Sequence, residues 1–365
     1  MKSALLTLMT WLLCFALSGQ KDSWISVRGS TGAFLPHRIS LPQLLTDKAS
    51  AFELKYSRTV DGSEAWHHYF KGPRKGIGFF VMDMGNPEEL GNIYSVYPFV
   101  DLPLDKGGSG RVLLHMGVGL AYLNKKYDYD ENFFNKAIGS HINYGIVLGL
   151  NYEYAVKRFR FGTGLSITHA SNAAIQLPNL GVNVASLDFS LAYRLNDLQE
   201  ETLEVIIPAW TGQSEFSVMT SFGFRESSSI TREKHGVQEL RGMYSRKFSS
   251  KSSYRLGADL IHNRASYQNL TGGSEQEFAM DVLQSGIFLG ITLDFGNASM
   301  YFNNGVYLTQ GFQEEGAIYH RFGGLWKVND RFTLDLCLKT HFAKADYLAF
   351  GIGYSLASNK IGTNE

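Results

Sequence analysis

Residues 112–122 read VLLHMGVGLAY and residues 142–152 read INYGIVLGLNY, and both stretches alternate between two kinds of side chain. The even-numbered residues from Val112 to Tyr122 are apolar, whereas the odd-numbered residues from His115 to Ala121 are polar or small. Successive side chains of a β-strand point to opposite faces. The alternation therefore predicts strands that have one apolar face and one polar face.

The same period-two pattern continues along the chain and predicts an all-β protein. It recurs in residues 159–171, 185–193, 286–295, 331–341 and 348–356. A soluble β-sandwich would show the same alternation. Strands of about 10 to 13 residues, with apolar faces that often end in Tyr or Phe, favour strands that cross a membrane at a tilt. We expect an antiparallel transmembrane β-barrel of about 14 strands, with 12 to 16 compatible, closed because an open edge in hydrocarbon is costly.

The connections between the expected strands alternate in length, as they do in outer-membrane barrels. Short turns are expected near residues 156–158, 249–252, 295–298 and 328–331, and long polar loops over residues 124–140 and 265–284. Residues 196–214 break this rule, because they are long where a short turn is due. Residues 22–60 are compatible with the first two strands or with a partial plug.

Charge and the first residues indicate the compartment. The 34 basic and 34 acidic side chains balance, so nothing favours a nucleic-acid partner. Lys2 precedes an apolar run from Ala4 to Leu17, which predicts a signal peptide over residues 1–19; an N-terminal anchor is the alternative. Residues 20–365 are then expected to form a single barrel domain in a bacterial outer membrane.

The side chains that could take part in catalysis lie at the end of the segment 159–171. Its odd-numbered residues should face lipid, yet this face ends in His169 and Ser171. An i, i+2 spacing places the two side chains on one face, roughly 7 Å apart, where imidazole and hydroxyl can meet. Asn183 has the outward parity on the next strand and can orient the imidazole. Asn172 can offer an amide to a developing oxyanion.

These residues carry a resemblance to a known family. His169-Ala170-Ser171-Asn172, followed by Pro178-Asn179-Leu180-Gly181, resembles the lipid A 3-O-deacylase family, also described as acyloxyacyl hydrolases. The resemblance spans roughly residues 112–195. It implies an outer-membrane hydrolase in which Ser171 is the nucleophile, His169 the base and Asn172 an oxyanion donor. The implied substrate is an ester-linked acyl chain of lipid A, the lipid part of lipopolysaccharide, and the implied chemistry needs no cofactor or metal.

The chain departs from the family at the third member of the triad. Where the family has a Glu, this chain has the neutral Asn183. The nearby acids Asp188 and Glu153 have the inward parity. Two functions therefore stay open: an esterase that deacylates lipid A, and a non-catalytic barrel, either a pore or an assembly component, with a degenerate site. Convergence of Ser171, His169 and Asn183 on the barrel exterior would favour the esterase. The oligomeric state stays undecided.

A second group of residues invites a different chemistry. The adjacent His67 and His68 could ligate a metal, but no third ligand stands at a suitable spacing, so we interpret them as loop histidines.

Overall fold

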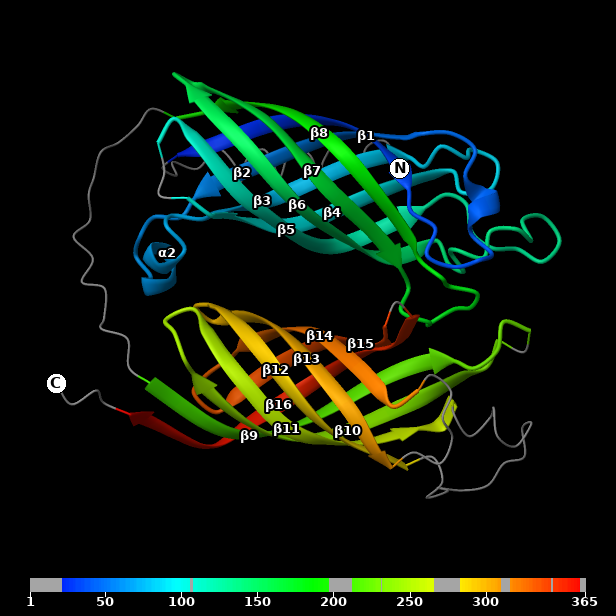
Figure 1. Ribbon diagram of the computed structural model, residues 1–365, viewed down its shortest axis with the longest axis vertical. Helices are drawn as coiled ribbons and strands as arrows, with labels where there is room; N and C mark the ends of the chain where they lie inside the picture. Colours follow the sequence, from blue (N-terminus) through cyan, green and yellow to red (C-terminus); the bar gives the residue numbers. More distant parts are fainter. Residues whose placement is uncertain are drawn as a thin grey trace, which may run out of the picture.

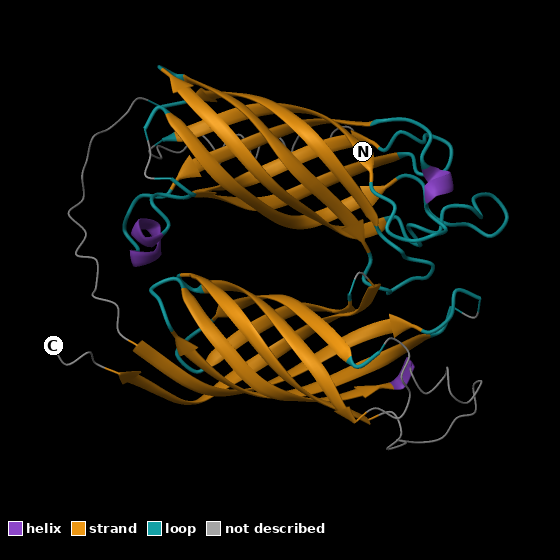
Figure 2. Ribbon diagram, in the orientation of Figure 1, coloured by secondary structure: helices purple, strands orange, loops and turns teal. Residues whose placement is uncertain are grey.

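The structure, a computed structural model, describes residues 22–105, 108–196, 212–230, 232–265, 283–309, 316–342 and 344–361. Most of this part of the chain is β-strand, as the alternation predicts (Figure 2). The first eight strands are β1 Ser23–Phe34, β2 Ala49–Thr59, β3 Arg74–Asp83, β4 Asn92–Pro103, β5 Gly110–Leu123, β6 Ile142–Val156, β7 Phe159–Ser171 and β8 Val182–Arg194. The second eight are β9 Gly212–Glu226, β10 Lys234–Lys247, β11 Ser252–Asn263, β12 Leu283–Phe295, β13 Ala298–Thr309, β14 Ile318–Lys327, β15 Phe332–His341 and β16 Lys344–Ile361. A 3-10 helix, η1 Pro42–Leu44, and a short helix, α2 Ala65–Tyr69, lie in the connections.

The strands form two closed antiparallel barrels of eight strands each (Figure 1). The first closes where β1 pairs with β8, from Trp24 opposite Arg194 to Phe34 opposite Val184. The second closes where β9 pairs with β16. This division corrects the expectation of one barrel over residues 20–365. Pairing of β8 back to β1 satisfies both backbone edges after eight strands, so no further strand is needed to close the first sheet.

The two-barrel arrangement accounts for the unusual length of residues 196–214. Residues 195–211 connect β8, which completes the first barrel, to β9, which begins the second. They are a connection between domains and not a turn within one sheet. Residues 197–211 lie outside the described residues, as does the expected signal peptide over residues 1–19. Residues 22–60 contribute β1 and β2 and form no plug.

The outer surfaces of both barrels are apolar, as the alternation predicts. Large apolar side chains on the outward faces are exposed; examples are Leu120, Leu165 and Phe189 on the first barrel and Phe222, Leu256, Leu289 and Phe350 on the second. Connections at one end of each barrel are short: β6 and β7 join through residues 157–158, and β12 and β13 through residues 296–297. The longer loops, which include residues 124–141 and 172–181, lie at the opposite end. Among the described residues, no helix is long and apolar enough to cross a membrane.

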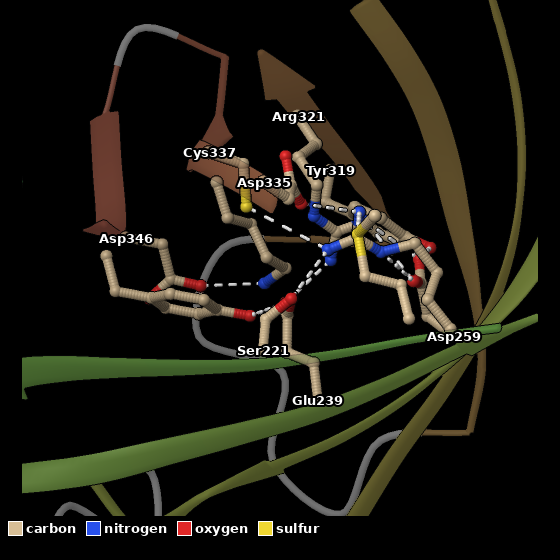
Figure 3. Close-up of polar contacts among 12 residues, drawn as sticks. Ser221, Glu239, Asp259, Tyr319, Arg321, Asp335, Cys337 and Asp346 are labelled. Carbon is tan, nitrogen blue, oxygen red and sulfur yellow. Dashed lines mark hydrogen bonds and ion pairs between the residues drawn. The ribbon is translucent and has the colours of Figure 1, made fainter. Parts of the chain in front are cut away.

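Charged side chains occupy the middle of both barrel interiors. In the second barrel, Arg241 forms ion pairs with Glu239 at 2.9 Å and Asp335 at 3.1 Å. Arg321 forms ion pairs with Glu239 at 2.7 Å and Asp259 at 3.0 Å (Figure 3). In the first barrel, Arg28, Arg74 and His115 make similar ion pairs with Glu53, Asp101, Glu153 and Asp188. Eight strands enclose a space that side chains can fill. This packing disfavours a wide aqueous channel.

The two barrels contact each other at the end with the short turns. Phe70, which directly follows α2 of the first barrel, stacks on Phe295 of the second with ring centroids 5.0 Å apart. Trp66 of α2 meets the same Phe295 edge-on at 6.1 Å. Lys251 lies 5.2 Å above the Phe70 ring. These contacts make one fixed junction between the domains.

Candidate active site

His169 and Asn183 are directly opposite each other on the neighbouring strands β7 and β8. Both side chains are on the outward face, and His169 Nδ1 lies 2.7 Å from Asn183 Oδ1. The parity argument predicts this placement, and the structure confirms it. Because the pair is held by the strand register, the imidazole is oriented by rigid elements and not by a loop.

His37 extends this pair into a chain of three side chains. It lies in the β1–β2 loop, where its Nε2 is 2.8 Å from the carbonyl oxygen of Leu180 and its Nδ1 is 2.9 Å from Asn183 Nδ2. A carbonyl oxygen can only accept, so His37 Nε2 carries the proton and Nδ1 accepts from the Asn183 amide. Asn183 Oδ1 then faces His169, whose Nδ1 must donate. The chain therefore leaves His169 Nε2 unprotonated, as a general base requires.

The sequence interpretation missed His37, which stands 146 positions from Asn183 in the chain. A lone histidine in a polar loop carries no signal of its own. Only closure of β1 against β8 brings the β1–β2 loop to the β7–β8 loop.

Ser171 ends β7, directly opposite Tyr144 on β6. Its Oγ accepts a hydrogen bond from Asn179 Nδ2 at 2.8 Å and another from the Ala173 backbone N–H at 3.2 Å. The residue is buried beneath the β7–β8 loop, with 2% of its surface exposed. Within the described part of the chain, no hydrogen bond joins Ser171 Oγ to the His169 ring. The hydroxyl is thus held by two donors on one side, and the imidazole stands on the same face two residues away.

Asn172 has a structural role that differs from the predicted one. Its Nδ2 donates to Ser140 Oγ at 2.8 Å and to the carbonyl oxygen of Gln176 at 2.9 Å. Its Oδ1 accepts from the Gln176 N–H at 3.3 Å. The amide is therefore engaged within the loop and does not point to the Ser171 hydroxyl. The donors that do are Asn179 and Ala173, which the sequence interpretation did not assign.

The backbone of the β7–β8 loop adopts left-handed conformations next to Ser171. Ala173 and Ala174 have φ angles of 57° and 61°. For residues with a Cβ this conformation costs roughly 1–2 kcal/mol each. Gly181 has a φ of 82°, and a Cβ there would stand 3.0 Å from Cε1 of His169. Glycine at 181 thus lets the loop return close to the imidazole, while the strain at 173 and 174 must be held by contacts.

The nearby acids do not supply the missing carboxylate. Asp188 points inward, where its Oδ2 is 3.2 Å from Arg28. Glu153 also points inward and binds Arg74 at 2.8 and 2.9 Å. The third member of the candidate triad is therefore the Asn183 amide. Among the described residues, no group of three or more His, Cys, Asp or Glu side chains could hold a metal ion.

A shallow apolar groove runs along the outer surface below this site. It has a volume of about 770 Å³, and its walls include Leu148, Leu165, Ile167 and Leu187. Ile167 and Ala185, which also line it, form the strand pair next to His169 and Asn183 on the same outward face. The groove therefore begins at the outward-facing residue pair next to the one that contains the imidazole of His169.

The fold and this site define a protein of two transmembrane β-barrels, the first of which carries a Ser–His–Asn cluster on its outer face. The family model of lipid A 3-O-deacylase (PagL) matches residues 50–192. The model of the C-terminal domain of acyloxyacyl hydrolase matches residues 214–359. The chain belongs to this lipid A 3-O-deacylase and acyloxyacyl hydrolase family; the first model matches β2 to β8 of the first barrel, and the second model matches β9 to β16 of the second. No curated protein matches the chain.

Solved structures are similar to about half or to most of the chain. Neisserial surface protein A has 10% identity and a TM-score of 0.34, over 47% of this chain and 97% of that one. The outer membrane enzyme PagL has 20% identity and a TM-score of 0.32, over 45% of this chain and 97% of that one. A mutant of the Rh. blastica porin has 10% identity and a TM-score of 0.20, over 92% of this chain and 99% of that one.

Proposed function

We propose that the protein is an outer-membrane esterase that removes an ester-linked acyl chain from lipid A through Ser171, His169 and Asn183. The observation that carries the proposal is the 2.7 Å contact between His169 and Asn183 on the outward face, next to Ser171. Family membership supports the substrate class, because the matching family is that of lipid A 3-O-deacylase.

The first step is attack of Ser171 Oγ on the ester carbonyl carbon. A rotation of the Ser171 side chain brings its hydroxyl to His169 Nε2, which takes the proton while the new C–O bond forms. Collapse of the tetrahedral intermediate breaks the bond to the sugar oxygen, and His169 returns the proton to that leaving group. Water, deprotonated by His169, then attacks the acyl carbon; the bond to Ser171 Oγ breaks, His169 returns the proton to this oxygen, and the fatty acid is released.

The same rotation frees the donors that now hold the hydroxyl. Asn179 Nδ2 and the Ala173 N–H both point to Ser171 Oγ in this conformation. Once the hydroxyl turns to His169, these two donors can bind the carbonyl oxygen of the substrate. Donors fixed in advance stabilise the charge that develops on this oxygen in the transition state. In the proposed mechanism Ala173 and Asn179 take the role that the sequence suggested for Asn172.

The place of the site suits a lipid that diffuses within the membrane. The groove bordered by Leu165, Ile167 and Leu187 is apolar and open on the barrel exterior, so an acyl chain can enter it laterally. Lys48 lines the same groove and offers a positive charge. This charge can attract an anionic head group to the groove.

Asn183 in place of Glu should lower the rate without abolishing the chemistry. The amide fixes the tautomer of His169, as a carboxylate would, but it adds no charge to stabilise the imidazolium. The charged networks in both barrels weigh against the alternative of a pore.

The proposal is tested by release of free fatty acid from purified lipopolysaccharide by the detergent-folded protein. His169→Ala should abolish release. His141→Ala is the matched control, because His141 bonds the Leu123 carbonyl at 2.7 Å and stays outside the cluster. Equal release by the native protein and His169→Ala would reject His169 as the base. No release by the folded native protein from several lipopolysaccharides would reject the esterase.

A further inference from the structure

Glu226, a residue of the second barrel, contacts the loop that carries the candidate oxyanion donors. Glu226 is the last residue of β9 and is 1% exposed. Its backbone N–H donates to the carbonyl oxygen of Ala174 at 3.0 Å. Its side-chain carboxylate accepts a hydrogen bond from the N–H of Leu177. Glu226 thus bonds both ends of the segment 174–177, which belongs to the other barrel.

The geometry of the second sheet leaves Glu226 available for this contact. The pairing of β9 with β16 extends only to Phe224, opposite Leu348. The N–H of Glu226 therefore bonds outside its own sheet, to the loop of the first barrel. A carboxylate bound to a backbone N–H is a charge-assisted contact, and it is stronger than a neutral one when it is shielded from water.

The contacted segment needs support from outside the loop. Ala173 and Ala174 hold left-handed φ angles of 57° and 61°, which alanine adopts only when contacts hold it there. The Ala173 N–H is one of the two donors to Ser171 Oγ. From within the first barrel, Asn172 bonds Gln176 inside this segment, and the Gly181 N–H bonds the Ala137 carbonyl at the end of the loop. Glu226 adds the contacts from the second barrel, at Ala174 and Leu177.

We propose that Glu226 is a positioning residue through which the second barrel holds the Ala173–Leu177 turn in place for catalysis by the first barrel. The inference rests on the proposed function, because the turn matters for catalysis only if Ser171 reacts. Phe295 of the second barrel packs on Phe70 at the opposite end. The two barrels are thus in contact at both ends, and these contacts hold Glu226 against the loop. The acyloxyacyl hydrolase C-terminal domain thereby completes a site that the first barrel carries.

The first test measures the contact itself, independently of activity. Hydrogen–deuterium exchange of the peptide that contains residues 172–181 is compared between the full-length native protein and its Glu226→Ala and Glu226→Gln variants. Glu226→Ala should speed exchange in this peptide at least tenfold, whereas Glu226→Gln, whose amide oxygen can still accept, should change it less. Glu215→Ala is the control, because Glu215 lies on β9 far from this loop. Unchanged exchange in Glu226→Ala would overturn the contact.

The second test measures the consequence for catalysis. Glu226→Ala should lower kcat for fatty acid release about 10- to 100-fold with little change in KM, and Glu226→Gln should recover most of it. In an Ala174→Gly background the loss should shrink, since glycine holds the left-handed turn at less cost. Faster exchange with an unchanged or raised kcat would overturn the positioning role. Faster exchange in a protein whose native form releases no fatty acid would support the contact and reject the proposed function.

Discussion

His169 on β7 and Asn183 on β8 form a directly opposed cross-strand pair whose side chains meet at 2.7 Å on the outer surface of the first barrel. Both strands are fixed on both sides by pairing, β7 between β6 and β8 and β8 between β7 and β1. The orientation of the imidazole is thus set by the sheet, and the amide sets its tautomer.

Replacing Asn183 should change the rate in a direction that depends on charge. Asn183→Asp and Asn183→Glu add a carboxylate that stabilises the imidazolium, so at least one of them should raise kcat about tenfold or more. Asn183→Ala leaves His169 without a fixed tautomer and should lower kcat about 100-fold. Steady-state kinetics of fatty acid release measures all three. A rate that is insensitive to every substitution at 183 would show that the amide has no part in the reaction.

His37 should matter through Asn183 and not through substrate binding. His37→Ala removes the acceptor that holds Asn183 Nδ2, so the amide can rotate and offer its NH2 to His169. We expect kcat to fall about tenfold with KM nearly constant. His68→Ala is the control, because His68 bonds the Gly62 carbonyl in the β2–β3 connection. Equal kinetics for the two variants would contradict the three-residue chain.

Gly181→Ala should damage the site beyond its effect on the backbone. An added Cβ suffers strain at a φ of 82° and also meets His169 Cε1 at 3.0 Å. Gly72→Ala provides the matched control, because Gly72 has a φ of 71° and a Cβ added there would meet nothing within 4 Å. Both variants should lose about 1–2 kcal/mol of stability in thermal unfolding, but only Gly181→Ala should lose activity. Matching kcat values in the two variants would refute the steric argument.

Arg241 should be important for the stability of the second barrel. It is fully buried, and its removal leaves Glu239 and Asp335 without one of their cationic partners. Arg241→Ala should lower the free energy of unfolding by roughly 3–5 kcal/mol, measured by urea titration of the detergent-folded protein. Lys327→Ala breaks an exposed pair with Asp330 and should leave the midpoint nearly unchanged. Similar midpoints for both variants would show that the network contributes little.

Much of the fold is predictable because strand alternation is a local signal. The outward parity of residues such as Leu165 and His169, and the short turns near 156–158 and 295–298, follow from the sequence alone. The number of barrels does not, because closure depends on whether β8 pairs with β1 or with a later strand. The unexpected length of residues 196–214 was the one signal of a boundary.

The candidate site divides in the same way. His169, Ser171 and Asn183 lie on adjacent strands, so parity and the family motif predict where they stand; their catalytic role stays a prediction. His37 and Glu226 reach the site from a distant loop and from the other barrel, and no local pattern marks either residue. Asn172 was assigned from its position next to Ser171 and from the family motif, and the hydrogen bonds within the loop engage its side chain elsewhere.

The most direct test of the central claim is mass spectrometry of lipid A incubated with the detergent-folded protein and, in parallel, with its Ser171→Ala variant. The account predicts that the native protein removes the mass of one ester-linked acyl chain and that Ser171→Ala, folded to the same extent, removes none. Loss of the same chain with both proteins would contradict Ser171 as the nucleophile. No loss with the native protein, across several lipid A structures, would contradict the esterase itself.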